Sequence, residues 1–422
     1  PCGHQVTHFE MNYVEDAGLI KIDLLGNRSL GVLMDTVAAV REHSPTPPIS
    51  DYRVLDADED VRAMMREGRT MGCFYIESPA MRQLLKRLGT EQFIDLTAAS
   101  SVIRPGVAES GMMQEFIRRT RGLPRQQDSH PLMEQIMPET HGVMVYQEDV
   151  IRVANAVAGF SFAEADVLRR GMSGKLKSRE QIIGLRERFV AGCRDNGLTV
   201  RDALEIWRQV ESFSGYAFCK AHSASFATLS MQVAYLKAHH PSEFMAAVLS
   251  NGGGFYGPGA YVSECRRLGL TVLPPDVNHS ALSYRSEGPG AVRVGLSVIK
   301  RVPEALKRRI VEGREARGRY QSLQDLVRRA RPGAAWLELL IDCGALDSLG
   351  LSRPELLRLM SLEYDRVAAV GDNPSRRLFS DEESAARARV MVGASPQPGL
   401  GEQVQKDLEH FGFVVRCHPL AA

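Results

Sequence analysis

The stretch LIKIDLLGNRSL, residues 19–30, places the carboxylate of Asp23 among leucines and isoleucines. A charged group among apolar neighbours is costly unless it is paired, hydrogen-bonded or bound to a cation. Asp23 therefore either ends a strand or caps the next helix, or it binds a divalent metal ion from a strand end. Lys21 lies on the same face of the expected strand and suits a polyphosphate or a simple ion pair. One carboxylate cannot hold two metal ions, so the metal interpretation needs partners from elsewhere.

A second group of polar residues lies in AFCKAHSASFATL, residues 217–229. Lys220, His222 and Ser223 come just ahead of a helical stretch, and a helix start beside a lysine is suited to binding an anion. Cys219 with His222 would suggest a thiol nucleophile, but no sequence feature supplies the third, orienting group. The thiol-nucleophile interpretation is therefore set aside.

The third group is RRGMSGKLKS, residues 169–178, which gathers Arg169, Arg170 and Lys175 around two glycines. The phosphate-loop pattern is not met, because its glycines are too close together and a leucine follows the lysine. Two interpretations stay open: a solvated basic turn between helices, or phosphate contact by the side chains.

Two weaker signals place polar residues beside apolar runs. SVIRPG does this for Arg104, and VMVYQEDV places Tyr146, Gln147 and Glu148 in the same kind of position.

The densest basic run lies near the turn IKRVPEA, where a short hydrophobic hairpin leading into a helix offers N–H groups and cations to a DNA phosphate. Such a run is also typical of a solvated helix face. Its cations are Lys300, Arg301, Lys307, Arg308, Arg309, Arg314, Arg317 and Arg319.

The elements that must position these residues follow from periodicity. GLIKIDLL alternates like a strand, and helical periodicity then runs from GVLMDTVAAVREH through residue 250 with interruptions. A Gly-rich break, SNGGGFYGPG, precedes a smaller mixed block. Residues 365–405 are polar and lack sustained periodicity, which predicts a linker, and the tail DLEHFGFVVRCHPL is strand-like.

Composition limits the function classes. The 52 basic and 51 acidic residues nearly cancel, so any nucleic-acid surface must come from local clustering. The seven cysteines contain no C-x-x-C pair, which indicates neither a zinc site nor a disulfide framework. No stretch approaches the length of a membrane span and no leader opens the chain, so we expect a cytoplasmic protein without membrane contact.

Read together and in order, these segments resemble the C-family bacterial DNA polymerases, the alpha subunit of DNA polymerase III and its relatives. The blocks that carry the resemblance are AGLIKIDLLG, CFYIESPAMRQLLKRL, IRPG, GVMVYQEDV, DVLRRGMSGK, GYAFCKAHSASFA, YLKAHHPSEFMAAVLSN, ECRRLGLTVLPPDVN and CGALDSLG. Within the family, SNGGGFY followed by YVSECRRLGL is most similar to the error-prone alpha-type polymerase of damage-induced mutagenesis.

The resemblance implies a mainly α fold with small α+β parts, in which a helical fingers domain follows the last palm strand and precedes a helix-hairpin-helix region. The expected divisions are residues 1–30 for the end of the palm, 31–250 for the fingers, 251–364 for the helix-hairpin-helix DNA-binding region, 365–405 for a linker and 406–422 for the lead-in to an oligonucleotide-binding barrel.

The resemblance also implies roles for the residues above. Asp23 matches a catalytic aspartate that binds one or both of two Mg²⁺ ions, and DNA contact falls to Lys300, Arg301, Lys307 and Arg308. The matched nucleotide-binding residues are Lys21, Arg104, Gln147, Arg169, Arg170, Lys175, Lys220, His222 and Ser223.

The function implied is template-directed nucleotidyl transfer on primer-template DNA with deoxynucleoside triphosphates, in translesion synthesis and DNA repair. The family's other two catalytic carboxylates belong to an upstream Asp-x-Asp strand that this sequence lacks, so we expect the chain alone to be inactive. The alternatives are a replicative alpha subunit and a non-catalytic DNA-binding remnant. A metabolic phosphotransferase is disfavoured by the failed phosphate-loop spacing.

Two departures from the family pattern stand out. The hairpin that usually reads Lys-Gly-hydrophobic-Gly is here KRVP, residues 300–303, which removes both flexible positions. In the expected linker, SRRLF at 375–379 lies where replicative relatives carry a sliding-clamp peptide, but it lacks the leading Gln. Partners other than DNA, such as a sliding clamp or mutagenesis accessory proteins, stay open.

Overall fold

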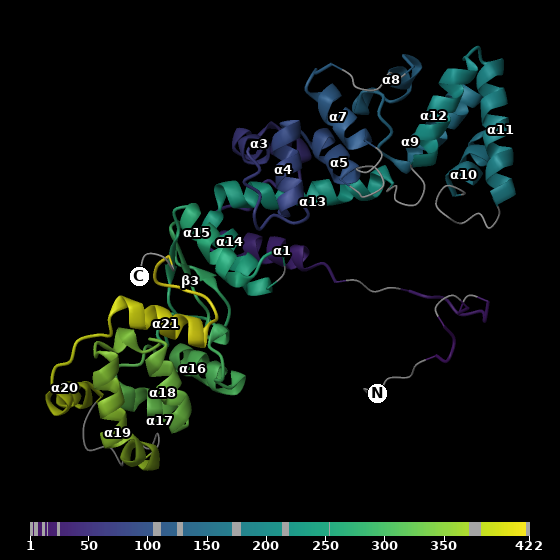
Figure 1. Cartoon of the computed structure of the whole chain (residues 1–422). Helices are drawn as coiled ribbons and strands as arrows, with labels where there is room; N and C mark the ends of the chain where they lie inside the picture. Colours follow the sequence, from purple (N-terminus) through teal and green to yellow (C-terminus); the bar gives the residue numbers. More distant parts are fainter. Residues whose placement is uncertain are drawn as a thin grey trace.

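The protein is mainly helical with one small three-stranded sheet, as its computed structural model shows (Figure 1). In Figure 1, α13 runs between a group containing α9 to α12 and a group containing α14, α15 and the sheet. The structure describes residues 3, 7–10, 13–14, 16–22, 26–103, 111–124, 130–170, 179–212, 219–252, 254–370 and 381–418.

The first part of the chain is built entirely of helices in the residues that the structure describes. Their apolar stripes face a common core, which α13 shares with α5, α3, α2 and α14. The helices are α1 (Arg28–Arg41), α2 (Tyr52–Ala57), α3 (Glu59–Arg66), α4 (Pro79–Leu88), α5 (Phe93–Val102), α7 (Met112–Thr120), α8 (Leu132–Ile136), η1 (Pro138–Thr140), α9 (Gln147–Ala158), α10 (Phe162–Arg170), α11 (Arg179–Asp195), α12 (Val200–Ser212), α13 (Lys220–His239) and α14 (Pro241–Asn251).

Local sequence signals explain where these helices begin and end, and α4 is an example. The hydroxyl of Ser78 accepts the N–H of Met81 at 3.2 Å, and Pro79 occupies the first helical position. Gly89 then ends the helix with a left-handed φ of 67°. Capping of this kind fixes helix ends from the sequence alone.

The second part surrounds the sheet with further helices. The strands are ordered β1-β3-β2; β1 runs parallel to β3, β2 runs antiparallel to it, and the paired Val272 and Val292 are both buried. The elements are α15 (Pro258–Arg267), β1 (Thr271–Leu273), β2 (Arg285–Ser286), β3 (Ala291–Arg293), η3 (Leu296–Val298), α16 (Glu304–Arg317), α17 (Leu323–Ala330), α18 (Ala334–Asp342), η4 (Asp347–Leu349), α19 (Arg353–Val370), α20 (Asp381–Val392) and α21 (Leu400–His410).

The segment before α1 differs from the sequence expectation. Residues 19–22 form no strand, and the side chains of Ile20 and Ile22 are 87% and 74% exposed. A strand needs a neighbour for its backbone hydrogen bonds, and the described residues offer none here. The cap of α1 is Asn27, which accepts the N–H of Ser29 at 3.0 Å. Asp23 lies outside the described residues.

The region predicted as a linker and a strand-like tail also differs. Helices α19 and α20 extend into residues 365–405, and α21 covers residues 400–410, so part of the expected linker is helical. Residues 411–418 contain no strand, because their apolar side chains, including Phe413 and Val415, are buried by packing instead of by sheet pairing.

A buried ion pair joins the two parts of the structure. The ammonium of Lys237 on α13 donates to Glu264 on α15 at 2.5 Å and to the carbonyl oxygens of Arg69 and Met71 at 2.8 and 2.7 Å. Both charged side chains are almost inaccessible to solvent. Full pairing is what makes a buried charge tolerable, so this contact fixes α15 against α13.

None of the helices among the described residues is both long and apolar enough to cross a membrane.

Candidate nucleotide and DNA interfaces

The N-terminus of α9 is the centre of the predicted nucleotide site. Asp149, in its first turn, accepts the N–H groups of Val145 and Tyr146 at 2.8 Å each and so fixes the entry of the chain into the helix. Burial raises the pKa of Asp149 to about 6, against the opposing effect of these two hydrogen bonds.

Cations from α10 meet this helix start. The side-chain oxygen of Gln147 accepts a hydrogen bond from the guanidinium of Arg169 at 3.0 Å. Arg169 and Arg170 both form ion pairs with Asp166, at 2.8 and 2.6 Å. The structure thus brings Gln147 and Arg169 together, with a carboxylate already paired to the two arginines, and their nucleotide contact stays a prediction.

A further cation arrives from α13. Lys220 begins that helix, and its backbone N–H donates to both carboxylate oxygens of Glu148, at 3.1 and 3.0 Å. Its ammonium pairs with Glu139 and lies 5.6 Å from the centroid of the Tyr146 ring. The cluster formed by Gln147, Arg169 and Lys220, called the finger cluster below, therefore contains cations that carboxylates already neutralise.

Two other predicted residues on α13 have different surroundings. The hydroxyl of Ser223 is within hydrogen-bond distance of the Ser101 hydroxyl, at 2.5 Å, and the residue is 1% exposed. Burial in the interface with α5 removes Ser223 from contact with a nucleotide, contrary to the prediction. The ring of His222 packs on Phe226, with 4.3 Å between centroids.

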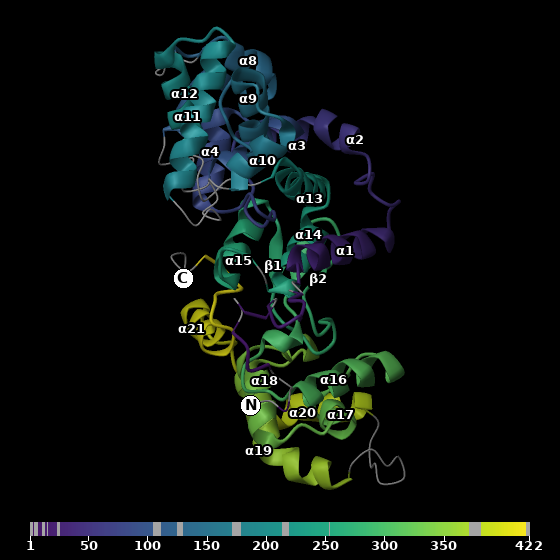
Figure 2. The same ribbon diagram turned by 90° about the vertical axis from the view of Figure 1, so that its right-hand side faces the viewer.

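Lys21, another predicted nucleotide contact, is not brought to the finger cluster. Lys21 is exposed in the segment before α1, which lies apart from α9 in both Figure 1 and Figure 2. Arg104 and Lys175 lie outside the described residues, as does SRRLF at 375–379.

The predicted DNA-binding hairpin connects η3 to α16. Lys300 and Arg301 are exposed in its turn, and Arg301 adopts a left-handed φ of 64°. That conformation favours glycine, so the turn keeps a glycine-type backbone although an arginine occupies the position. Arg308 is largely exposed, 3.8 Å from Glu304.

Lys307 departs from the prediction of DNA contact. Its side chain is 5% exposed, and its ammonium donates to the carbonyl oxygen of Ser297 at 3.1 Å. Burial lowers the pKa of Lys307. The side chain therefore stabilises the hairpin from inside, because it is directed away from solvent.

The C-terminal helix α21 supports the same hairpin. The carbonyl oxygen of His410 accepts the N–H of Lys300 at 3.0 Å. Asp407 on α21 in turn accepts the N–H of Val415 at 2.8 Å and pairs with Arg416. No local pattern in the sequence predicts this contact, since more than a hundred positions separate the two segments.

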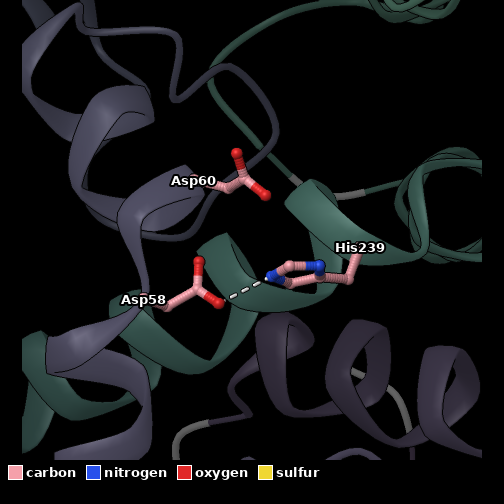
Figure 3. Close-up of side chains that lie close together, drawn as sticks. All are labelled: Asp58, Asp60 and His239. Carbon is pink, nitrogen blue, oxygen red and sulfur yellow. Dashed lines mark hydrogen bonds and ion pairs between the residues drawn. The ribbon is translucent and has the colours of Figure 1, made fainter.

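Asp58, Asp60 and His239 form a further group among the described residues, with one potential ligand atom from each lying within 4.8 Å of the others (Figure 3). Each has a structural role. Asp58 caps α3 through the N–H of Val61 at 3.0 Å and pairs with His239 at 2.8 Å, while Asp60 lies in the first turn of α3 and His239 in the last turn of α13. Helix ends favour these charges.

Two regions of the chain are similar to known protein families. Residues 29–197 match the bacterial DNA polymerase III alpha subunit finger domain, and residues 269–356 match a helix-hairpin-helix motif. The chain is therefore similar to a DNA polymerase III alpha-type finger domain followed by a helix-hairpin-helix region. The predicted order of these two parts is confirmed.

Individual relatives agree with this polymerase type. The chain is 33% identical over 431 residues to the DNA polymerase III subunit alpha of Campylobacter jejuni and 36% identical over 440 residues to that of Escherichia coli K12. It is 33% identical over 440 residues to an error-prone DNA polymerase of Anaeromyxobacter dehalogenans. These alignments cover 99% of this chain and 35%, 37% and 38% of the relatives, so the chain spans little more than a third of their length.

Proposed function

We propose that the chain supplies the fingers and the helix-hairpin-helix region of a bacterial DNA-directed DNA polymerase. The reaction joins a primer 3′-hydroxyl to the α-phosphate of a deoxynucleoside triphosphate and releases pyrophosphate. The observation that carries the proposal is the finger cluster: within a finger domain of the DNA polymerase III alpha type, Gln147, Arg169 and Lys220 converge on one helix start.

In this proposal the finger cluster receives the triphosphate. Lys220, Arg169 and Arg170 neutralise phosphate charge, and Gln147 orients Arg169 through their hydrogen bond. Because Glu139 and Asp166 hold these cations in the structure, the triphosphate must compete with the carboxylates for them. Loading a nucleotide therefore includes an exchange of ion-pair partners.

Two Mg²⁺ ions, when bound, would activate the primer hydroxyl and stabilise the leaving pyrophosphate. The resemblance makes Asp23 their ligand. Among the described residues, the group of Asp58, Asp60 and His239 does not fit this role, because Mg²⁺ prefers oxygen ligands and each side chain already serves a helix end. The finger cluster supplies cations and not an oxygen ligand set.

The hairpin is the proposed DNA contact. Lys300, Arg301 and Arg308 are exposed around the start of α16, where backbone N–H groups and the helix dipole favour a phosphate. Helix α21 fixes the hairpin through Lys300. Binding through these cations releases counterions from DNA, so affinity falls as salt rises.

We further propose that the polymerase belongs to the error-prone branch that acts in damage-induced translesion synthesis and repair. The support is the similarity of SNGGGFY followed by YVSECRRLGL to that branch, together with an error-prone polymerase among the relatives. A replicative alpha subunit is the alternative, supported by the relatives of that name.

Primer extension and binding test these proposals together. The purified chain is expected to bind a fluorescent primer-template at low salt but not to extend it in Mg²⁺, because Asp23 alone cannot organise two metal ions. Extension by this chain would overturn its expected inactivity, and absence of DNA binding at low salt would overturn the DNA-contact role. Binding without any affinity for deoxynucleoside triphosphates would leave the non-catalytic DNA-binding module as the better account.

A further inference from the structure

A large cleft separates the finger helices from the far end of α16. Its volume is 990 Å³, and its walls come from α1 and α14 on one side and from β2, the segment before it and the end of α16 on the other. Figure 2 shows α1 and α14 on one side of α16 with β2 between them. This volume lies at the upper end of the range for small-molecule sites, about 300–1,000 Å³.

One wall of the cleft is basic. The guanidinium of Arg314 donates to the carbonyl oxygens of Val277 and Ser280 at 3.2 and 2.7 Å, and so it keeps its full charge without a carboxylate partner. Arg285 and Arg319 are exposed, and neither side chain forms an ion pair within the described residues. The wall therefore presents three guanidinium groups outside close ion pairs, beside Glu287, whose carboxylate pairs with Arg293.

The opposite wall is acidic. Asp35 on α1 accepts a hydrogen bond from Asn251 at 2.8 Å, and Glu42, the exposed C-cap of α1, also lines the cleft. Deeper in the cleft, the buried Glu243 accepts the Ser286 hydroxyl at 3.0 Å and lies 3.4 Å from His43. Two walls of opposite charge thus face one another.

Small apolar side chains also line the cleft, on α1 and α14 and in the segment before β2. Ala39, Ala246, Ala247 and Ala281 all line the cleft. Alanines leave room for a flat ring and offer it apolar contact, whereas the walls offer hydrogen bonds at either end. The ligand that fits this order is anionic at one end, flat in the middle and rich in N–H donors at the other.

We propose that this cleft binds a nucleoside phosphate, with the phosphate on Arg285, Arg314 and Arg319 and the base amino groups on the acidic wall. Carboxylates accept hydrogen bonds from base amino groups, and arginine binds phosphate through paired N–H donors. The nucleoside phosphate is either a free nucleotide or one nucleotide of a single-stranded DNA. The site is distinct from the hairpin, because the part of α16 between Glu304 and Arg314, about 15 Å long, separates Arg314 from the proposed DNA-contact turn.

Photocrosslinking tests the site directly, with two probes that separate the sources. The probes are 8-azido-dATP and a single-stranded oligonucleotide that carries the same azido base, each followed by mass spectrometry of the crosslinked peptide. We expect crosslinks within residues 35–47 or 276–288. Labelling by the free nucleotide alone identifies a nucleotide site, and labelling by the oligonucleotide identifies a single-stranded DNA site. If neither probe crosslinks within residues 35–47 or 276–288, the proposal is overturned.

Matched variants add a quantitative test that is independent of the finger cluster. In a Lys220→Glu background, Arg285→Glu with Arg319→Glu is expected to weaken binding of the labelled probe at least tenfold. Arg201→Glu, an exposed arginine on α12, is the control and should change binding by less than twofold. Equal binding by the double variant and the control, or equal competition by inorganic triphosphate and dATP, would contradict a nucleoside phosphate site.

Discussion

The finger cluster and the hairpin both gather cations, but they hold them differently. In the finger cluster, Lys220 pairs with Glu139, and Arg169 and Arg170 share Asp166. In the hairpin, the cations of the turn are exposed, and Arg308 has only a distant contact with Glu304. The same residue types are neutralised in one region and available in the other.

This difference separates two kinds of recognition. Cations without close partners attract DNA phosphate without regard to sequence and at long range, which suits holding a duplex. Cations that are paired with a carboxylate bind only a ligand whose affinity for them exceeds that of the carboxylate. This arrangement suits the selection of a triphosphate. Under the proposed function, the carboxylates of the finger cluster compete with the triphosphate for these cations.

The largest expected effect concerns Lys237, a buried lysine whose ammonium is fully paired. Lys237→Met leaves Glu264 short of a partner and leaves the carbonyl oxygens of Arg69 and Met71 without a donor, so we expect a loss of about 3–5 kcal/mol of unfolding free energy. Chemical denaturation followed by circular dichroism measures it. Lys86→Met on the surface of α4 is the control, and a similar loss in both would show that pairing is not the cause.

The next effect is a pH dependence at Asp149. Its pKa is about 6 in the folded protein and near 3.9 when unfolded, so the folded state binds the proton more tightly and this group's contribution to stability falls as pH rises from 4 to 6. The fall is on the order of 2 kcal/mol. Asp149→Asn should remove it, since the amide oxygen still accepts both N–H groups. Thermal unfolding at pH 4, 5, 6 and 7 checks this, with the exposed Asp60→Asn as a variant that keeps the wild-type profile.

A smaller effect tests competition in the finger cluster. Glu139→Gln frees the ammonium of Lys220, and the affinity for dATP should rise about three- to fivefold, because a partly exposed ion pair is worth up to about 1 kcal/mol. Fluorescence titration with a labelled dATP measures it. Glu205→Gln breaks an ion pair with Arg208 on α12 and should change nothing. Unchanged or weaker binding in Glu139→Gln would show that the carboxylate does not compete.

The smallest effect concerns the backbone of the hairpin. Arg301→Gly relieves a left-handed conformation, so stability should rise by about 0.5–1 kcal/mol while DNA affinity falls with the lost charge. Arg308 lies in α16 and has an ordinary helical backbone. Arg308→Ala should therefore lower the affinity for DNA without a gain in stability. A gain in stability for both variants would mean that charge repulsion, and not φ, is responsible.

The sequence predicted the mainly helical fold and the order of the finger and helix-hairpin-helix regions well, because amphipathic periodicity and capping are local. It also named the residues of the finger cluster, although it could not give their partners: Lys220 and Glu139 are 81 positions apart. Carboxylate partners contributed by distant segments leave no local pattern. For the same reason the His239 contact with Asp58 could not be found.

The misses have equally specific causes. The alternation around Ile20 and Ile22 is typical of a strand, but no described neighbour pairs with it. In the tail, the apolar side chains of Phe413 and Val415 are buried by packing, which periodicity does not distinguish from a strand. Lys307 belongs to a basic run yet is directed inward, and composition alone cannot tell a buried lysine from an exposed one.

The most direct test measures how DNA affinity depends on salt. A fluorescent primer-template is titrated with the chain in the absence of nucleotide, at salt concentrations from about 50 to 200 mM. The hairpin variant Lys300→Ala with Arg301→Ala is compared with the finger variant Lys220→Ala with Arg169→Ala. Our account predicts that the negative slope of log affinity against log salt becomes shallower by about 1.8 in the hairpin variant, since each phosphate contact contributes about −0.9, and that it is unchanged in the finger variant. Two results would contradict the division between paired and available cations. One is an equally reduced salt dependence in the finger variant, and the other is an unchanged salt dependence in the hairpin variant.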